Sequence, residues 1–298
     1  MKVLVTGATG LVGTALVKKL TESGYCVHVL TRKKSEQPNY FYWDFQNNEI
    51  DERAFSGVQA IVHLAGANIG KRWNDEYKKD LYTSRIDSAL FLKEKCEHLG
   101  IRLKVFISAS GINYYGTFTS NQILTEESPI IKQDFLAHLC EKWEAAAYKF
   151  NNISERVVCL RTGLVLSQHG GSFPPLQKMT RLNLGSPVGS GRQWMNWIHI
   201  DDLVRLYLYA LENAHIKGSY NAIADEALTN RDFMKTLAKK QNRLFWPIPI
   251  PALFLKLIFG EMSSLILEGT KASNEKIKSQ RFNFKYTKLA EAVENLIR

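Results

Sequence analysis

The segment Lys2-Val-Leu-Val-Thr-Gly7-Ala-Thr-Gly10-Leu-Val-Gly13 decides the fold of this 298-residue chain. Its apolar start predicts a buried strand, and the apolar residues after Gly10 recur at helical spacing. Glycines between a strand and a helix are typical of a dinucleotide-binding βαβ unit, although a plain structural turn is the alternative. Gly7 permits the tight turn, Gly10 lets the backbone approach a pyrophosphate, and Gly13 allows close helix packing. We therefore expect cofactor contacts from the turn and the helix start, namely Gly7, Thr9, Gly10, Leu11, Val12 and Gly13.

The end of the second apolar run indicates which dinucleotide is bound. NAD sites usually carry an acid about twenty residues after the glycines, bonded to the ribose hydroxyls. Between Gly13 and Glu36 the only acid is Glu22, within the first predicted helix, and the second run ends in Thr31-Arg32-Lys33-Lys34. The Arg32 guanidinium can pair with a 2′-phosphate. The pattern favours NADP over NAD, and a solvated basic loop is the alternative.

Composition sets limits on the other classes of function. The chain is 45% hydrophobic and 23% charged, with a net charge of +10, as in a soluble globular protein that attracts anions. No nucleic-acid-binding motif accompanies the charge, so we predict no nucleic acid partner. The four cysteines have no metal-ligand spacing, and we predict no metal site.

Location and membrane contact are predicted from the ends of the chain and from its apolar runs. The chain starts on its first strand, with no room for a signal peptide, and we expect a cytoplasmic protein. The longest apolar segment, Leu244–Gly260, contains three prolines, so we expect no membrane span and no membrane partner. Within it, Ile248–Phe259 could line a core or form a dimer face, and we expect the core. The oligomeric state is not predicted.

Strand-like runs alternate with amphipathic helical patterns through the first half of the chain. This alternation predicts a Rossmann-type α/β fold, a doubly wound parallel sheet with helices on both faces. We expect a cofactor-binding domain over residues 1–166, with segments around 192–222 returning to it, and a smaller helix-rich C-terminal lobe over 167–298. Ligands of such sheets bind at the carboxyl ends of the strands. The runs are Val3–Thr6, Val27–Thr31, Ala60–Leu64, Val105–Ser108 and Val157–Arg161.

Six motifs together resemble a known superfamily. They are Thr6-Gly-Ala-Thr-Gly-Leu-Val-Gly13, His63-Leu-Ala-Gly-Ala-Asn68, Ser108-Ala-Ser110 with Tyr114-Tyr115-Gly116, Asp134-Phe-Leu-Ala137 with Trp143-Glu144, Leu160-Arg-Thr-Gly163 and the long Gly189–Leu203 motif. The chain is similar to the extended branch of the short-chain dehydrogenase/reductases. More narrowly, it resembles an atypical nucleoside-diphosphate-sugar epimerase-like family with an extra C-terminal domain.

The resemblance implies further cofactor contacts. Leu64, Ala65 and Gly66 are expected to run beside the cofactor, and Asp44 is expected near the adenine. Arg85 takes the place of a helix residue that faces the cofactor crevice. Gly163, the last residue of the Leu160–Gly163 motif, is also expected to contact the cofactor. The alternatives are a surface carboxylate for Asp44 and a solvated helix cation for Arg85.

The same resemblance implies that this chain lacks the usual catalytic residues. Active members use a Tyr and, four residues later, a Lys, positions that fall on Leu136 and Cys140 here; a one-residue slip gives Phe135 and Leu139. The usual pair is absent in either register. We name Ser110, Tyr114 and Tyr115 as candidate catalytic residues, with aromatic packing as the alternative for the tyrosines.

Candidate substrate contacts lie in two polar segments. They are Asn68, Arg192, Trp194 and His199, while Trp197 is expected to be buried. For His199 a structural role before a helix is the alternative. The resulting prediction is an NADP(H)-binding oxidoreductase or nucleotide-sugar epimerase with non-standard catalytic residues, acting on a small, anionic or nucleotide-linked substrate. The competing hypotheses are a non-enzymatic NADP(H)-sensing regulator and, on charge alone, a nucleic-acid-binding protein.

Overall fold

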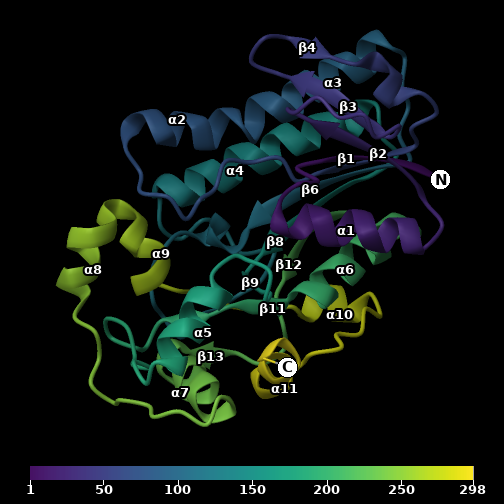
Figure 1. Ribbon diagram of the computed structural model, residues 1–298. Coiled ribbons are helices and arrows are strands. Elements are labelled where there is room, and N and C mark those ends of the chain that lie inside the picture. Colours follow the sequence, from purple (N-terminus) through teal and green to yellow (C-terminus); the bar gives the residue numbers. More distant parts are fainter. Residues whose placement is uncertain (298) are drawn as a thin grey trace.

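The computed structural model describes residues 1–297 and confirms the predicted α/β class (Figure 1). A central sheet of eight strands has the order β12-β8-β6-β5-β1-β2-β3-β4. All of its strand pairs are parallel except β3 with β4. The strands are β1 (Lys2–Thr6), β2 (Cys26–Thr31), β3 (Tyr40–Asp44), β4 (Glu49–Ile50), β5 (Ala60–His63), β6 (Val105–Gly111), β8 (Val157–Thr162) and β12 (Gly218–Ala222).

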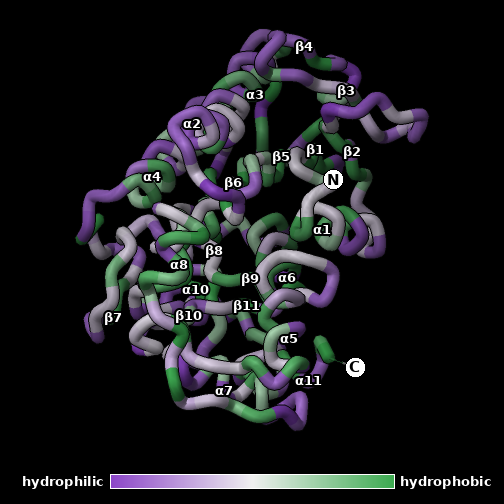
Figure 2. The backbone as a smooth tube through the Cα atoms, turned by 60° about the vertical axis from the view of Figure 1, so that its left-hand side comes forward, coloured by the Kyte–Doolittle hydropathy of each residue, from purple (hydrophilic) through white to green (hydrophobic). Residues whose placement is uncertain are grey.

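Helices cover both faces of this sheet, as its doubly hydrophobic strands require. On one face α1 (Leu11–Glu22) and α6 (Ile200–Glu212) pack against the strands, joined by Ile277 of α10 (Glu275–Ser279). On the other face lie α3 (Ile86–His98) and α4 (Phe135–Tyr148), next to α2 (Asp75–Thr83). The hydropathy colouring of Figure 2 follows this arrangement, with the apolar strands β1 and β5 enclosed between helices.

The later part of the chain contributes to both the sheet and a second layer. Strand β12 extends the sheet beside β8, and α6 packs on α1, so residues 200–222 are part of the first unit. A separate apolar cluster joins α5 (Phe173–Arg181), α7 (Asn230–Lys240) and α11 (Leu289–Ile297). Short pairs link the segments between them: β9 (Leu164–Leu166) with β11 (Trp197–His199), β10 (Trp194–Met195) with β13 (Leu228–Thr229), and β7 (Ile123–Leu124) with β14 (Lys271–Ala272).

One expectation about this second layer is wrong. Ile248–Phe259 was expected to pack in a core, but α8 (Ala252–Phe259) contains no buried residue. The reason is that α8 packs mainly on the short turn η4 (Gly260–Ser263) that follows it, so most of its apolar surface has no partner in the described chain. Helix α9 (Ser264–Leu267) continues from η4.

Candidate functional site

The glycine turn after β1 has the geometry that a dinucleotide site requires. Gly7 has a φ of +65°, and a Cβ atom there would lie 2.5 Å from the carbonyl oxygen of Leu64. A Cβ on Gly13 would lie 2.2 Å from the Gly7 oxygen, so α1 can pack this closely only without a side chain. Gly10 is the N-cap of α1 and has no capping side chain. The first N–H groups of α1 therefore remain available for a phosphate, and the residues fit a diphosphate.

A buried polar link holds the ends of β1 and β5 together. The Thr6 hydroxyl accepts hydrogen bonds from the backbone N–H groups of Leu64 and Ala65, both at 3.1 Å, and lies 2.9 Å from Nδ1 of His63. Burial lowers the pKa of His63 to about 4, so the ring is neutral at physiological pH. Neither residue type signals this cross-strand contact in the sequence, so the roles of Thr6 and His63 were not predicted.

The residues expected at the adenosine end follow two adjacent strands. Arg32 directly follows β2, and it is exposed, as are Lys33 and Lys34. Asp44 ends β3, which pairs with β2 in register Thr31 to Tyr42. The Asp44 carboxylate accepts hydrogen bonds from the Gln46 N–H and the Asn47 amide. Arg32 and Asp44 thus share one edge of the sheet, and their cofactor contacts stay predictions.

Arg85 is not the solvated cation that was the alternative for it. Its side chain is buried and donates to the carbonyl oxygens of Ala67 (2.9 Å) and Leu81 (3.1 Å). The guanidinium lies over the ring of Trp143, 5.0 Å from its centroid. A Cβ on Gly66 would lie 2.9 Å from this guanidinium, which explains the glycine. Burial lowers the pKa of Arg85 to about 10, and Arg85 supports the wall of the crevice beside Gly66.

Gly163 has a packing reason of its own. A Cβ there would lie 2.4 Å from the carbonyl oxygen of Asn196, and the Gly163 N–H donates to the Ala222 oxygen. The glycine therefore permits β9 to lie against the segment before β11. Its expected cofactor contact is not needed to explain it.

The Ser110 hydroxyl belongs to a buried network that sequence analysis missed. It donates to Glu144 Oε1 at 2.8 Å, and Arg161 donates to both carboxylate oxygens at 2.8 and 2.9 Å. The Ser219 hydroxyl donates to Glu144 Oε2, also at 2.8 Å. The Ser110 proton is thereby committed, and this oxygen can only accept a further hydrogen bond while Glu144 is ionised. The Arg161–Glu144 pair could not be foreseen because its members lie on β8 and α4.

The two candidate tyrosines differ in their surroundings. Tyr115 is fully buried, donates to Asn221 (2.9 Å) and accepts from Arg161 (3.1 Å). Burial raises its pKa to about 12. This hydroxyl therefore has both a donor and an acceptor partner within the protein, and a catalytic role for Tyr115 stays a prediction. Tyr114 is only partly buried, and the Arg161 guanidinium stacks on its ring, 3.5 Å from the centroid.

Helix α4 stands where active members of the family that this chain resembles carry the catalytic Tyr and Lys. Its N-cap Asp134 accepts from the Ala137 N–H and from both the backbone N–H and hydroxyl of Thr117. Leu136 and Cys140 lie on its buried side, and a Cβ on Gly111 would lie 3.1 Å from the Cys140 sulfur. Burial raises the pKa of this thiol to about 12, so it offers no thiolate near neutral pH.

A cavity of about 580 Å³ lies beside the start of α4. The Rossmann unit contributes aromatic, apolar and polar side chains, namely Trp73, Phe135, Leu136, Thr117, the amines of Lys78 and Lys132 and the carboxylate of Asp134. The opposite wall is formed by Lys256, Gly260, Glu261, Ser263, Ser264, Leu267 and Glu268. An ion pair between Lys78 and Glu261 connects the two walls.

The four predicted substrate residues do not line this cavity. The Asn68 side chain accepts from the Gly70 N–H, Arg192 is exposed, and the Trp194 indole donates to the Ser120 oxygen. His199 is 1% exposed, and its Nδ1 accepts from the Asp201 N–H at the start of α6. Its Nδ1 thus has the structural role that was the alternative, while its buried Nε2 has no hydrogen-bond partner among the described residues, and substrate contact stays a prediction. Trp197 is buried, as predicted.

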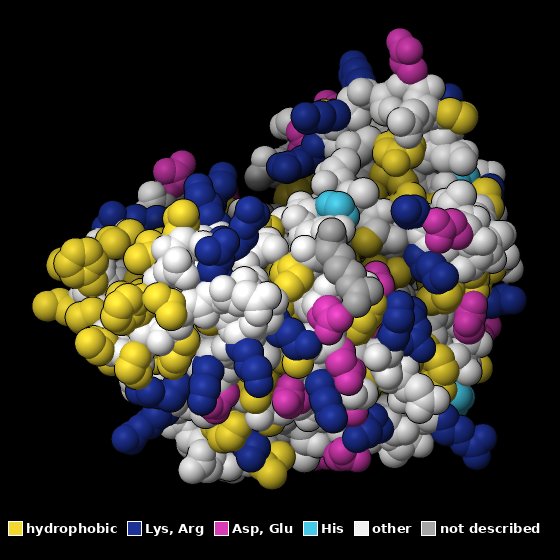
Figure 3. All heavy atoms as spheres, turned by 60° about the horizontal axis from the view of Figure 1, so that its bottom comes forward, with side chains coloured by type: hydrophobic (Ala, Val, Ile, Leu, Met, Phe, Trp, Pro, Cys, Tyr) yellow, Lys and Arg dark blue, Asp and Glu magenta, His cyan; other side chains and the backbone are white. Residues whose placement is uncertain are grey.

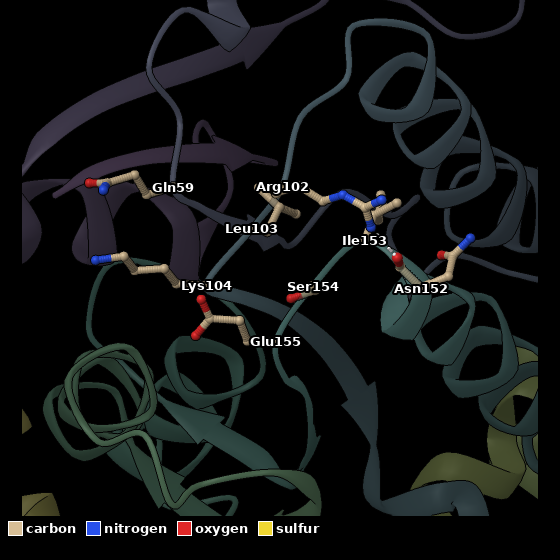
Figure 4. Close-up of a pocket in the computed structure, with 8 residues that line it drawn as sticks. All are labelled: Gln59, Arg102, Leu103, Lys104, Asn152, Ile153, Ser154 and Glu155. Carbon is tan, nitrogen blue, oxygen red and sulfur yellow. Dashed lines mark hydrogen bonds between the residues drawn. The ribbon is translucent and has the colours of Figure 1, made fainter.

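A second hollow, of about 380 Å³, lies at the amino-terminal ends of the sheet strands, opposite the glycine turn (Figure 4). It is formed where β5, β6 and β8 begin, and its residues are Gln59, Arg102, Leu103, Lys104, Asn152, Ile153, Ser154 and Glu155. Figure 4 shows the Arg102 guanidinium turned to the Asn152 carbonyl, to which it donates. Parallel sheets bind ligands at the other ends of their strands, so this hollow is not the candidate site.

Two classes of feature are absent from residues 1–297. No cluster of three or more His, Cys, Asp or Glu side chains in this part of the chain could hold a metal ion. No helix in it combines the length and apolar character needed to cross a membrane.

Comparisons with known proteins agree with this architecture. Residues 3–222 match the model of the NAD dependent epimerase/dehydratase family, and residues 250–296 match a domain of unknown function, DUF1731. Among relatives, the chloroplastic epimerase family protein SDR39U1 homolog of Arabidopsis thaliana is 35% identical over 100% of this chain and 87% of its own length. The epimerase family protein YfhF of Bacillus subtilis is 32% identical, over 100% of this chain and 98% of its own.

Two solved structures are similar over nearly all of this chain. The human epimerase family protein SDR39U1, solved with NADPH, has a TM-score of 0.89 and 31% identity, covering 99% of both chains. A nucleoside-diphosphate sugar epimerase from Corynebacterium glutamicum has a TM-score of 0.82 and 31% identity, covering 100% of this chain and 58% of its own.

Proposed function

Because the chain belongs to the NAD dependent epimerase/dehydratase family, we propose that it binds NADP(H) in the crevice above β1, β2 and β5. The observation that carries this proposal is the Gly7–Gly13 turn, which leaves the first N–H groups of α1 free for a diphosphate. Arg32 at the end of β2, with no acid in its place, supports a 2′-phosphate. The similar human protein was solved with NADPH.

We infer a redox reaction on a small molecule, as an oxidoreductase or a nucleotide-sugar epimerase. The bound nicotinamide would supply or accept hydride. The cavity beside Leu136 takes the substrate, since its volume falls within the range of ligand sites. Amines of Lys78, Lys132 and Lys256 line the cavity beside the carboxylates of Asp134, Glu261 and Glu268, and Lys78 is paired with Glu261. We assign binding of an anionic or nucleotide-linked substrate to the Lys132 amine, with Trp73 and Phe135 offering ring faces.

Two hydroxyl groups of the chain are the candidates for hydrogen bonding and proton transfer. Ser110 is 3% exposed and does not line the cavity, and since its proton is held by Glu144, it can only accept a hydrogen bond from a group that reaches it. Tyr114, which is partly exposed and held by Arg161, is the remaining hydroxyl that can donate or accept a proton. These roles replace the Tyr and Lys of other members. We also propose a cytoplasmic location, which the four unpaired cysteines support.

Calorimetric titration tests the cofactor assignment. NADPH should bind at least tenfold more tightly than NADH, and Arg32→Ala should lose about 10- to 100-fold of NADPH affinity, the worth of a charge-assisted contact. The matched control is Lys18→Ala, which removes another exposed cation, on α1, and should leave both affinities unchanged. Equal affinities for NADPH and NADH in the wild type would refute the preference.

Titration with UDP-glucose, in the presence of saturating NADP⁺, tests the cavity. Binding should weaken about tenfold in Lys132→Met, because this amine lies in the wall and would lose a phosphate contact. The absence of any UDP-glucose or UDP binding would exclude a nucleotide-linked substrate. Turnover is then sought by NADPH absorbance across carbonyl compounds.

A non-enzymatic NADP(H) sensor is the second candidate. The buried Leu136 and Cys140 in place of the usual pair favour it, as does the locked Tyr115 hydroxyl. Such a sensor should capture different proteins with and without NADPH in pull-downs. Identical partner sets, or turnover with any substrate, would remove this candidate.

A further inference from the structure

The outer face of α8 is a strongly exposed apolar surface. Leu253, Phe254 and Leu257 are 69%, 64% and 70% exposed, and Ile258 is 52% exposed. These four side chains follow a spacing that places them on one side of the helix. Figure 3 shows a projecting cluster of hydrophobic side chains at the end of the molecule where α8 lies.

The apolar surface continues from α8 onto two chain segments that lie side by side. The Trp246 N–H donates to the Gly185 oxygen and the Ile250 N–H to the Pro187 oxygen, so residues 244–250 are fixed along residues 182–188. Large exposed side chains project from both segments. We call the whole surface the apolar ridge, and its members are Leu182, Leu184, Leu244, Trp246, Ile248, Leu253, Phe254, Leu257 and Ile258.

Basic residues are interleaved with the ridge. Arg181 precedes Leu182, Arg243 precedes Leu244, and Lys256 lies on α8 itself, all exposed. The two segments that carry the ridge, residues 181–188 and 243–259, contain these three basic side chains and no acid. Figure 3 shows Lys and Arg side chains around the inner edge of the projecting cluster.

We propose that the apolar ridge docks the protein on the surface of a membrane containing anionic lipids. A projecting ridge of apolar side chains with cations beside it is the pattern that inserts at the headgroup boundary. Its single exposed Trp, Trp246, is a residue type enriched at that depth. A second copy of the chain fits less well, because a twofold contact would bring the Arg181, Arg243 and Lys256 charges of both copies together.

The docking is peripheral. Helix α8 has eight residues and is about 12 Å long, far short of a bilayer core of about 30 Å. The sequence analysis predicts no membrane partner, and the exposure of α8 leads us to propose the opposite for a peripheral contact. Lys256 and Gly260 also line the 580 Å³ cavity, so docking would bring that cavity close to the lipid surface.

Vesicle co-sedimentation of the full chain tests this proposal. The vesicles are phosphatidylcholine alone or mixed with phosphatidylglycerol, at low and high salt. Binding should require phosphatidylglycerol and weaken with salt. Phe254→Ser/Leu257→Ser should reduce the partition coefficient at least tenfold, and Arg181→Glu/Arg243→Glu should reduce binding to the anionic vesicles. The matched control is Ile123→Ser, which removes an exposed apolar side chain elsewhere and should bind as the wild type does.

Thermal melting of each variant verifies folding, which is expected to be unchanged because the substituted side chains are exposed. No binding to anionic vesicles, or equal binding by Phe254→Ser/Leu257→Ser and the wild type, would overturn the proposal. So would a dimer in solution that the same double variant abolishes without any lipid binding, which would assign the ridge to a second copy.

Discussion

Replacing Glu144 by glutamine should strongly destabilise the protein. The side chain is about the same size, so the change removes the charge and leaves the packing. The carboxylate is 5% exposed and accepts four hydrogen bonds, two from Arg161 and one each from Ser110 and Ser219. Burial acts to lower the pKa of Arg161, yet the Glu144 carboxylate raises it above its ordinary value, so the guanidinium stays charged.

The magnitude follows from the unpaired charge that the substitution leaves behind. Breaking a buried ion pair by removing one partner costs about 3–5 kcal/mol. At about 2–4 °C per kcal/mol for a chain near this size, Tm should fall by roughly 6–20 °C. Differential scanning fluorimetry and urea unfolding measure the change. The control Glu141→Gln alters a half-exposed carboxylate on the same helix and should stay within about 0.5 kcal/mol.

A double variant separates the pair from its surroundings. Arg161→Met should cost less in the Glu144→Gln background than in the wild type, with a coupling energy above about 1 kcal/mol. A Tm for Glu144→Gln within 2 °C of the wild type, or additive effects in the double variant, would refute the reasoning. Either result would mean that the charge pair contributes little to the native state.

Three further outcomes are expected. Gly7→Ala should cost at least about 1–2 kcal/mol, since φ is +65° and the new Cβ meets the Leu64 oxygen, and it should abolish NADPH binding in calorimetry; retained affinity would contradict the fit. Cys140→Lys should destabilise the protein by about 3 kcal/mol or more, because it buries an amine near Arg85. An unchanged Tm would contradict this and would show that the position tolerates the Lys of the usual catalytic pair. Burial lowers the pKa of His63 to about 4 against 6.5 when unfolded, so its contribution is complete above pH 6.5. As the pH falls toward 4, about 3 kcal/mol should be lost, and His63→Gln should flatten this pH dependence of Tm; equal slopes would refute it.

The first βαβ unit illustrates what can be read from local pattern. A strand, a glycine turn and a helix follow one another within Lys2–Glu22, and the backbone conformation of Gly7 is a local requirement. The parallel sheet also follows, because alternating strand and helix patterns have few ways to bury their apolar faces. The missing Tyr and Lys were identified from the resemblance to the short-chain dehydrogenase/reductases, because both positions of that pair fall on one helix and can be located by alignment.

The buried network and the exposed ridge show the limit of such reading. Ser110, Glu144, Arg161 and Ser219 come from four separate elements, and only the packing of α4 on β6, β8 and β12 makes them partners. The same packing turned Arg85 inward and locked the Tyr115 hydroxyl.

The sequence by itself therefore determined the Gly7–Gly13 turn, the alternation of strands and helices and the basic residues at the end of β2, because these features depend on neighbours along the backbone. The tertiary structure alone decided which polar groups meet and which apolar faces stay uncovered. Helix α8 is the plainest case. An apolar run carries the same letters whether another element covers it or not, and its burial depends on segments far away in the sequence.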